Sequence, residues 1–232
     1  MTRYVRSSKL TQYVRKRRDD GSGFVSRSAY KLVQLAEKYP LLRPGRAVVD
    51  LGAAPGGWCQ AVLQTCASTR LYALDLLPLQ ASLPSVQFMQ GDFTEESTRH
   101  ALRTLVAEQG QDSHVDVVLS DMMGRSVRTD QANTSGNVIR DSQASLDLCE
   151  AAFDFCQAML RPTPDATVRP SKSTPTQDLP SVFVCKYFMS AEADEFRREV
   201  LVKHFKAVRS EKMDASRTGS REQYWVCLGY RH

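Results

Sequence analysis

Apolar and polar positions alternate along this chain in a pattern that predicts strands separated by helices. Short runs of β-branched and apolar residues are typical of strands buried on both faces. They occupy residues 46–52, 71–77, 86–89, 115–121, Val182–Phe188 and 223–230, with a shorter strand around Ala207. Apolar residues at helical spacing predict helices from Ser26 to Pro40 and over residues 55–66, 94–108, 139–160 and 191–204. This alternation predicts an α/β fold with a mostly parallel sheet and helices on both faces.

Two segments fall outside this pattern. Residues 161–180 contain five of the ten prolines and almost no apolar residues, which predicts a flexible surface loop. The first 25 residues form a basic arm, with seven Lys or Arg residues before the first acid at Asp19. We therefore expect an arm over residues 1–25 and a single domain over residues 26–232.

The basic arm has three interpretations. Clustered cations release counterions from nucleic acid, so the arm could bind RNA phosphates. An Arg-rich, Ser-containing segment that is poor in acids is also typical of an organelle-targeting presequence, and a solvated tail would have a similar composition. The candidates for RNA contact are Arg3, Arg6, Lys9, Arg15, Lys16, Arg17, Arg18 and Arg27, with Tyr4 and Tyr13 as residues that could stack on bases.

The turn VVDLGAAPGGW, residues 48–58, predicts a ligand-binding loop. Glycines after a strand permit a tight reversal and let the backbone approach a ligand at a helix N-terminus. Its G-x-x-x-G-G spacing differs from the dinucleotide pattern G-x-G-x-x-G. Asp75, at the end of the next strand, is placed to accept ribose hydroxyls, and Asp92 could accept from an exocyclic amine. A ribose and an adenine without a pyrophosphate cradle indicate S-adenosylmethionine, although the two acids could instead serve only as helix caps.

A lysine interrupts the buried strand VFVCKYF. Lys186 and Asp121 each end a predicted strand, so both should project toward the edge where the glycine loop opens. A partly desolvated lysine favours the neutral amine and can act as a general base, which a nearby carboxylate opposes or orients. A structural ion pair at the rim of the sheet would place the same two residues together.

Seven motifs spread over nearly the whole chain resemble the FtsJ/RrmJ family of RNA ribose 2′-O-methyltransferases. In the family's order they are SRSAYKL, VVDLGAAPGGW, ALDLLP, QGDF, LSDM, FVCKYF and SRTGSREQYW. The resemblance implies a Rossmann-like class I methyltransferase fold with a seven-stranded sheet. It also implies a Lys-Asp-Lys-Glu catalytic tetrad at Lys31, Asp121, Lys186 and Glu222. Without the resemblance, Lys31 would be read as a solvated residue, because it lies off the apolar stripe of its helix.

The resemblance also implies a binding site for S-adenosylmethionine. Its residues would be Gly52, Ala53, Pro55, Gly56, Gly57, Trp58, Asp75, Leu76, Asp92, Phe93 and Asp121. Lys186 would withdraw the 2′-hydroxyl proton, and Asp121 would hold and tune the amine. Lys31 would support the oxyanion or take part in the proton transfer, and Glu222 would orient a lysine or the ribose.

A narrower resemblance points to a substrate. Residues 131–152 are similar to a stretch of the fungal mitochondrial branch, whose substrate is a uridine ribose in the A-loop of large-subunit ribosomal RNA. This implies a mitochondrial matrix enzyme that works on a ribosome-assembly intermediate. Two features depart from the family: Met123-Gly124-Arg125 replace Ala-Pro-Asn after Asp121, and the Pro-Gly-Gly turn before the lysine strand is missing.

Composition and charge limit the classes of protein to which this chain can belong. The formal net charge is +5, and no apolar stretch is long enough to cross a bilayer, so we expect no membrane span. The six cysteines and four histidines show no metal-ligand spacing, so we expect no metal and mainly reduced, buried thiols. Two rival functions stay open: methylation of transfer RNA or of a messenger-RNA cap, and a ribosome-assembly role in which catalysis is dispensable.

Overall fold

A single mixed sheet of seven strands forms the centre of the molecule. The computed structural model describes residues 23–109, 112–123, 138–163, 179–216 and 219–231. The strands are β1 (Ala47–Leu51), β2 (Arg70–Asp75), β3 (Val86–Gln90), β4 (Val117–Ser120), β5 (Val182–Phe188), β6 (Phe205–Glu211) and β7 (Glu222–Tyr230). Their order is β3-β2-β1-β4-β5-β7-β6; β1 to β5 run parallel, and β7 is antiparallel to both β5 and β6. The predicted fold class is confirmed.

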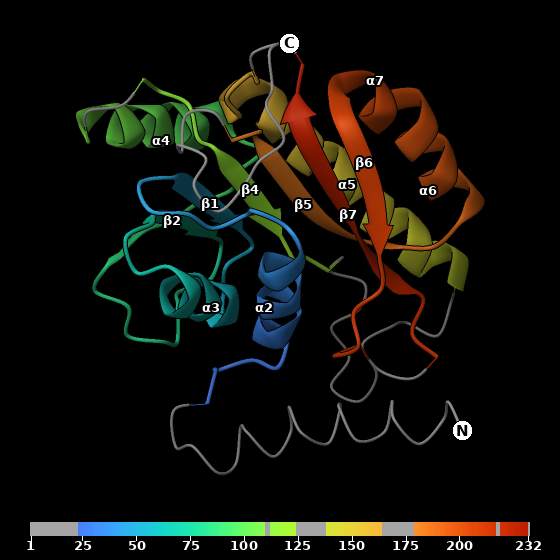
Figure 1. Ribbon diagram of the computed structural model, residues 1–232, viewed down its shortest axis with the longest axis horizontal. Coiled ribbons are helices and arrows are strands. Elements are labelled where there is room, and N and C mark those ends of the chain that lie inside the picture. The colour runs from blue at the N-terminus through green and yellow to red at the C-terminus, as the bar shows by residue number, and fades with distance from the viewer. Residues whose placement is uncertain (1–22, 110–111, 124–137, 164–178, 217–218, 232) are drawn as a thin grey trace.

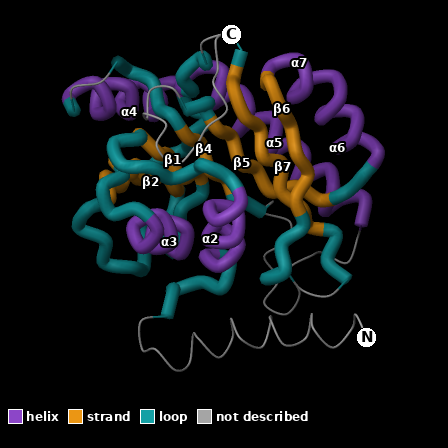
Figure 2. The backbone as a smooth tube through the Cα atoms, viewed as in Figure 1, coloured by secondary structure: helices purple, strands orange, loops and turns teal. Residues whose placement is uncertain are grey.

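Helices cover both faces of this sheet (Figures 1 and 2). On one face lie α2 (Ala29–Lys38) and α3 (Gly57–Thr65), which pack on one apolar cluster of the core. On the other lie α4 (Glu96–Glu108), α5 (Val138–Met159) and α6 (Ala191–Phe196), which pack on a second cluster. A π-helical turn, Arg197–Leu201, continues α6 into α7 (Val202–His204).

Period-two alternation decides which strand side chains reach which face. Val182 and Val184 of β5 belong to the cluster beneath α2 and α3, whereas Phe183 and Cys185 belong to the cluster beneath α5. Successive side chains of a strand point to opposite faces, so Lys186 continues the row that faces α2. The sequence pattern of the strand therefore fixes the side of the sheet on which its lysine appears.

The structure changes the bounds of several predicted elements: β6 is longer than expected, whereas β1, β4 and α4 are shorter. The strand expected around Ala207 is seven residues long, because its pairing with β7 continues to Glu211. Phe24, at the end of the predicted basic arm, is buried and packs edge-on against Tyr30. Most of that arm and most of the proline-rich loop lie outside the described residues. No helix in the described part of the chain is long and apolar enough to cross a membrane.

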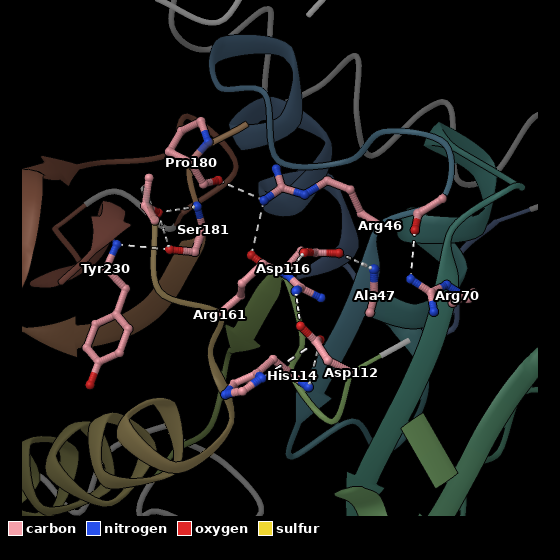
Figure 3. Close-up of polar contacts among 12 residues, drawn as sticks. Arg46, Ala47, Arg70, Asp112, His114, Asp116, Arg161, Pro180, Ser181 and Tyr230 are labelled. Carbon is pink, nitrogen blue, oxygen red and sulfur yellow. Dashed lines mark hydrogen bonds and ion pairs between the residues drawn. The ribbon is translucent and has the colours of Figure 1, made fainter. Parts of the chain in front are cut away.

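A buried arginine ties together the edge of the sheet where β1, β4 and β5 begin (Figure 3). The Arg46 guanidinium is 1% exposed and donates to the backbone carbonyls of Pro40, Leu41, Asp116 and Pro180 at 2.7–3.5 Å. The Asp116 carboxylate accepts from the backbone amide of Ala47 and from Arg161. Burial lowers the pKa of Arg46 to about 10, so the guanidinium stays charged at neutral pH. This network fixes three strand starts against one another.

Substitution of Arg46 by methionine should strongly destabilise the fold. Four carbonyl groups would lose a charged donor inside the protein, where water cannot replace it, so we expect a loss of about 3–5 kcal/mol. Urea unfolding would measure this loss. Arg198→Met is a matched control, because its side chain is 65% exposed, and it should change the unfolding free energy by less than about 0.5 kcal/mol. Equal effects of the two substitutions would contradict a stabilising role for Arg46.

Candidate active site

The glycine loop after β1 opens a cavity at the carboxyl edge of the parallel strands. Gly52 has a φ of 72° and Gly56 a φ of 109°, conformations that L side chains rarely adopt. A Cβ at Gly52 would also lie 2.2 Å from the Met122 side chain. The two glycines therefore let the chain turn sharply into α3 and leave a cavity of about 610 Å³ beside the turn.

Nearly all the predicted donor-binding residues line this cavity. Of the residues that the sequence indicated, the lining includes Gly52, Ala53, Pro55, Gly57, Trp58, Asp75, Leu76, Asp92, Phe93 and Asp121, so only Gly56 is missing from it. Lys186 lines the same cavity, which places a predicted catalytic group beside the predicted donor site. Other lining residues that sequence reasoning missed are Ser26, Ser28, Asp50, Ala54, Leu74, Leu77, Gly91, Thr94, Met122, Met123 and Leu148.

The two carboxylates expected to bind the nucleoside are both held in place by hydrogen bonds from loop residues. Asp75 accepts from the backbone amides of Ala54 and Leu77, each at 2.8 Å. Asp92 accepts from the backbone amide and the hydroxyl of Thr94, at 2.9 and 2.7 Å, just before α4 begins. Each group thus stabilises a turn, as a purely structural acid would, while also lining the cavity.

Asp50 is a buried acid that the sequence reading passed over. Its side chain lines the cavity, is 1% exposed, and accepts from the Cys59 thiol at 3.3 Å. Burial raises the pKa of Asp50 to about 8, although the bond from Cys59 acts in the opposite direction. The signal was present in the sequence, because an acid in the apolar run AVVDL is as unusual as the lysine in VFVCKYF.

The four predicted catalytic residues come together although they lie far apart along the chain. Lys31 of α2 donates to Glu222 Oε1 at 2.5 Å across 191 residues of sequence, and both side chains are 9% exposed. From its helix pattern alone Lys31 would be read as solvated, but its side chain is buried and pairs with Glu222 at the start of β7. This convergence shows that the helix stripe alone was a poor guide to its surroundings.

Lys186 and Asp121 form the second half of the cluster. Lys186 Nζ donates to the backbone carbonyl of Asp121 at 2.5 Å and lies 3.3 Å from Asp121 Oδ1. The lysine side chain is 5% exposed and that of the aspartate is 16% exposed. Burial would raise the pKa of Asp121, but the ammonium groups of Lys186 and Lys31 hold it below its ordinary value. The carboxylate is therefore ionised at neutral pH.

A tyrosine that sequence reasoning missed joins the two halves. The Tyr224 hydroxyl donates to Asp121 Oδ1 at 2.6 Å and lies 3.5 Å from Glu222 Oε1. Its ring packs against Trp58, and Lys31 Nζ lies 5.6 Å from the ring centroid. Burial and the two neighbouring carboxylates raise the pKa of Tyr224 well above its ordinary value, so the phenol remains a donor. An aromatic residue in a buried strand resembles any core residue, which is why no sequence signal marked it.

Removal of the Tyr224 hydroxyl should slow the methyl transfer that the predicted tetrad would catalyse, with little effect on folding. Tyr224→Phe keeps the ring but deprives Asp121 of its closest side-chain donor, so we expect a decrease in kcat of about tenfold, the value of one hydrogen bond to a charged group. Steady-state kinetics would measure it. Tyr187→Phe is the control, because its buried hydroxyl donates to Gln223 at 2.8 Å on the other face of the sheet. An unchanged kcat in Tyr224→Phe would show that the hydroxyl does not support the tetrad.

The remaining expectations concern RNA contact and metal. Arg27 is exposed at the start of α2, where its guanidinium reaches the carbonyl of Ala215 at 3.5 Å. The other predicted RNA-contact residues of the arm, from Arg3 to Arg18 with Tyr4 and Tyr13, lie outside the described residues. The six cysteines are free thiols. Within the described ranges, no group of three or more His, Cys, Asp or Glu side chains is arranged to hold a metal ion.

Comparison with known proteins agrees with this geometry. Residues 24–230 match the family described as FtsJ-like methyltransferase. The Ribosomal RNA large subunit methyltransferase E of Alkalilimnicola ehrlichii is 40% identical over 210 residues, which cover 90% of this chain and 86% of that protein. The protein of the same name from Pseudomonas fluorescens is 37% identical over 220 residues, 94% of this chain and 90% of the relative.

A solved structure supports the fold independently. The crystal structure of a protein described as a ribosomal RNA methyltransferase from Plasmodium falciparum aligns with a TM-score of 0.66, covers 88% of this chain and 97% of its own, and is 23% identical. At that identity the likeness concerns the fold alone. The family match and the bacterial relatives, in contrast, cover nearly the whole chain. The protein therefore belongs to the FtsJ-like methyltransferase family.

Proposed function

We propose that this protein transfers a methyl group from S-adenosylmethionine to the 2′-hydroxyl of a ribose in large-subunit ribosomal RNA. One observation carries the proposal: Lys31, Asp121, Lys186 and Glu222 form one cluster joined by Tyr224, and Asp121 and Lys186 of that cluster line the cavity beside the glycine loop. Such a cluster provides both an amine that can accept a proton and cations that can stabilise an oxyanion.

The cavity has the groups that S-adenosylmethionine requires. Asp75 and Asp92 supply acceptors for a ribose and an amino group. Asp50 is a buried carboxyl whose only donor among the described residues is the weak Cys59 thiol. A buried carboxyl with such a poor partner is suited to an ammonium, which the amino-acid end of the donor carries. The residues present therefore fit this cofactor.

The protein's own residues would act on the acceptor hydroxyl. When bound, S-adenosylmethionine supplies an electrophilic methyl group on a sulfonium. Lys186, once its ammonium has released a proton, would accept the 2′-hydroxyl proton as the oxygen bonds to the methyl carbon. The carbon–sulfur bond of the sulfonium would break in the same step and leave a neutral thioether. Asp121 orients the amine and stabilises the ammonium that forms, and Lys31, held by Glu222, stabilises the developing negative charge on oxygen.

Two features support the proposed substrate and location: the names of the relatives concern the ribosomal large subunit, and the basic opening segment concerns the mitochondrion. The bacterial relatives at 37–40% identity carry names that specify the ribosomal large subunit. The basic segment over residues 1–18 has the composition of a presequence or an RNA-binding arm. We propose that the target is a uridine in the A-loop of mitochondrial large-subunit RNA, reached in the matrix on an assembly intermediate.

A methyl-transfer assay with competing RNA substrates tests the proposal. The purified protein would be incubated with S-adenosylmethionine labelled at its methyl group and, separately, with a large-subunit RNA fragment containing the A-loop, a transfer RNA and a capped messenger RNA. We expect label only in the large-subunit RNA fragment, at a ribose whose adjacent phosphodiester bond resists alkaline cleavage. Label in transfer RNA or the cap would support the rival substrates instead.

Localisation requires a separate measurement. Fractionation of cells that express the full chain with a C-terminal tag should place the protein in the mitochondrial matrix. Ribose methylation of the A-loop uridine in mitochondrial RNA should disappear when the gene is deleted. A cytosolic protein, or unchanged methylation of that uridine, would contradict this part of the proposal.

A further inference from the structure

The connection between β6 and β7 is longer than two antiparallel neighbours require. Strand β6 ends at Glu211 and β7 begins at Glu222, so residues 212–221 join them, whereas about two to five residues close most hairpins. Met213 and Ala215 of this connection are buried in the core cluster beneath α2. A long connection with buried anchors indicates a role beyond reversal of the chain.

The connection brings a hydroxyl to the tetrad. Ser216 is buried, and its Oγ donates to Glu222 Oε1 at 2.9 Å. The same oxygen accepts from Lys31 Nζ at 2.5 Å and lies 3.5 Å from the Tyr224 hydroxyl. Donors from a loop and a helix thus converge on one carboxylate oxygen, and a hydroxyl from a strand lies within 3.5 Å of it.

The connection is also attached to the helix that carries Lys31. The Ala215 carbonyl accepts from Arg27 and the Ala215 amide donates to Gln34, both at 3.5 Å. These contacts lie on either side of Lys31 along the start and body of α2. The two donors to Glu222 that come from outside β7 therefore belong to one packed unit of helix and connection.

We propose that Ser216 is a positioning residue for the tetrad, which fixes the Glu222 carboxylate so that Lys31 is held at the acceptor site. This inference rests on the proposed function. The terminal torsion of a glutamate is broad, so one ion pair does not define the orientation of its carboxylate. A second, neutral donor removes that freedom without adding a charge that would compete with Lys31. Loss of the hydroxyl would let carboxylate and ammonium shift together away from the reacting oxygen.

Substitution of Ser216 by alanine tests this role. We expect kcat to fall by about 10-fold or more, the value of a hydrogen bond to a charged group. The donor dissociation constant and the KM for RNA should stay within about twofold, because Ser216 does not line the cavity. Ser216→Thr keeps the hydroxyl and should restore kcat to within about threefold of the wild type. If the alanine variant does not fold, Ser216→Cys, which donates only weakly, takes its place.

Ser181→Ala provides the matched control. Ser181 is also buried. Its hydroxyl forms hydrogen bonds with Thr163 and with the backbone amide of Tyr230, at the end of the parallel strands away from the tetrad (Figure 3). It should lower the melting temperature and leave kcat unchanged. An unchanged kcat in Ser216→Ala, or a threonine variant as slow as the alanine variant, overturns the inference while the wild-type enzyme remains active. An inactive wild type would instead contradict the proposed function itself.

Discussion

Replacement of Lys186 by methionine should reduce methyl transfer by about 10²–10⁴-fold, the contribution typical of a general base. Methionine fills a similar volume, so the cavity wall should persist while the amine is lost. Asp121 would lose its nearest cation, 3.3 Å from the ammonium, and its pKa should rise because that ammonium helps to keep it low. Single-turnover kinetics with saturating donor and RNA would isolate the chemical step.

Lys38→Met is the control for loss of a lysine. Lys38 lies at the C-terminal end of α2. Its side chain is 58% exposed and pairs with Glu211 outside the cavity. Its substitution should leave the rate within about twofold, since exposed ion pairs contribute little. Wild-type rates in Lys186→Met would show that the base has been assigned to the wrong residue.

The same Lys186 variant also separates catalysis from a scaffold role. Cells that carry only the methionine variant should accumulate large-subunit intermediates if the modification is needed for assembly. Normal ribosome maturation without methylation would show that the protein acts mainly by binding RNA. The two outcomes differ although the fold is the same, because the substitution removes one amine and leaves the surface intact.

The periodicity of apolar residues was sufficient to predict the fold, because most strands contain enough apolar and β-branched residues to be recognised from their own sequence. The run from Val182 to Phe188 contains enough β-branched and aromatic residues to define a buried strand whatever it packs against. The length of β6 was underestimated, because its sequence, FKAVRSE, has few apolar residues and its extent depends on pairing with β7. Elements with strong local patterns were therefore predicted better than elements that depend on a partner.

The residues of the candidate site also differ in how well the sequence predicted them. The tetrad was identified by its resemblance to a family, and the glycine loop by its chemistry, since both carry distinctive residue types in local motifs. Tyr224 and Ser216 carry none, because a tyrosine in a strand and a serine in a loop are ordinary. Their importance arises from contacts with Asp121 and Glu222, which only the tertiary structure brings into reach.

Asp50→Asn is expected to stabilise the donor-free protein and to weaken donor binding. Burial raises the pKa of Asp50 to about 8 from an ordinary value of 3.8. Between these two pH values the folded protein holds a proton that the unfolded chain releases, so stability falls as pH rises through that window. Asparagine removes this titration and should increase the unfolding free energy at pH 7 by on the order of 3 kcal/mol, or several degrees in Tm.

Donor binding should respond in the opposite direction. An ammonium binds the ionised form of Asp50, so wild-type affinity for S-adenosylmethionine should increase from pH 6 to pH 8, with release of a proton on binding. Asparagine cannot ionise, and its affinity should be about 10–100-fold lower and independent of pH in this range. Calorimetry in buffers of different ionisation enthalpy would measure both the affinity and the proton release.

Asp116→Asn makes the comparison decisive. Asp116 is also a buried acid, but its carboxylate is already paired with Arg161 at 2.9 Å, far from the cavity lining. Its substitution should destabilise the protein and leave donor affinity unchanged, whereas Asp50→Asn should stabilise the protein and weaken donor binding. If Asp50→Asn instead lowers Tm, or binds the donor as tightly as the wild type at pH 8, then the buried carboxyl is a structural group. Opposite signs in the two variants would show that Asp50 is retained for its ligand at a cost in stability.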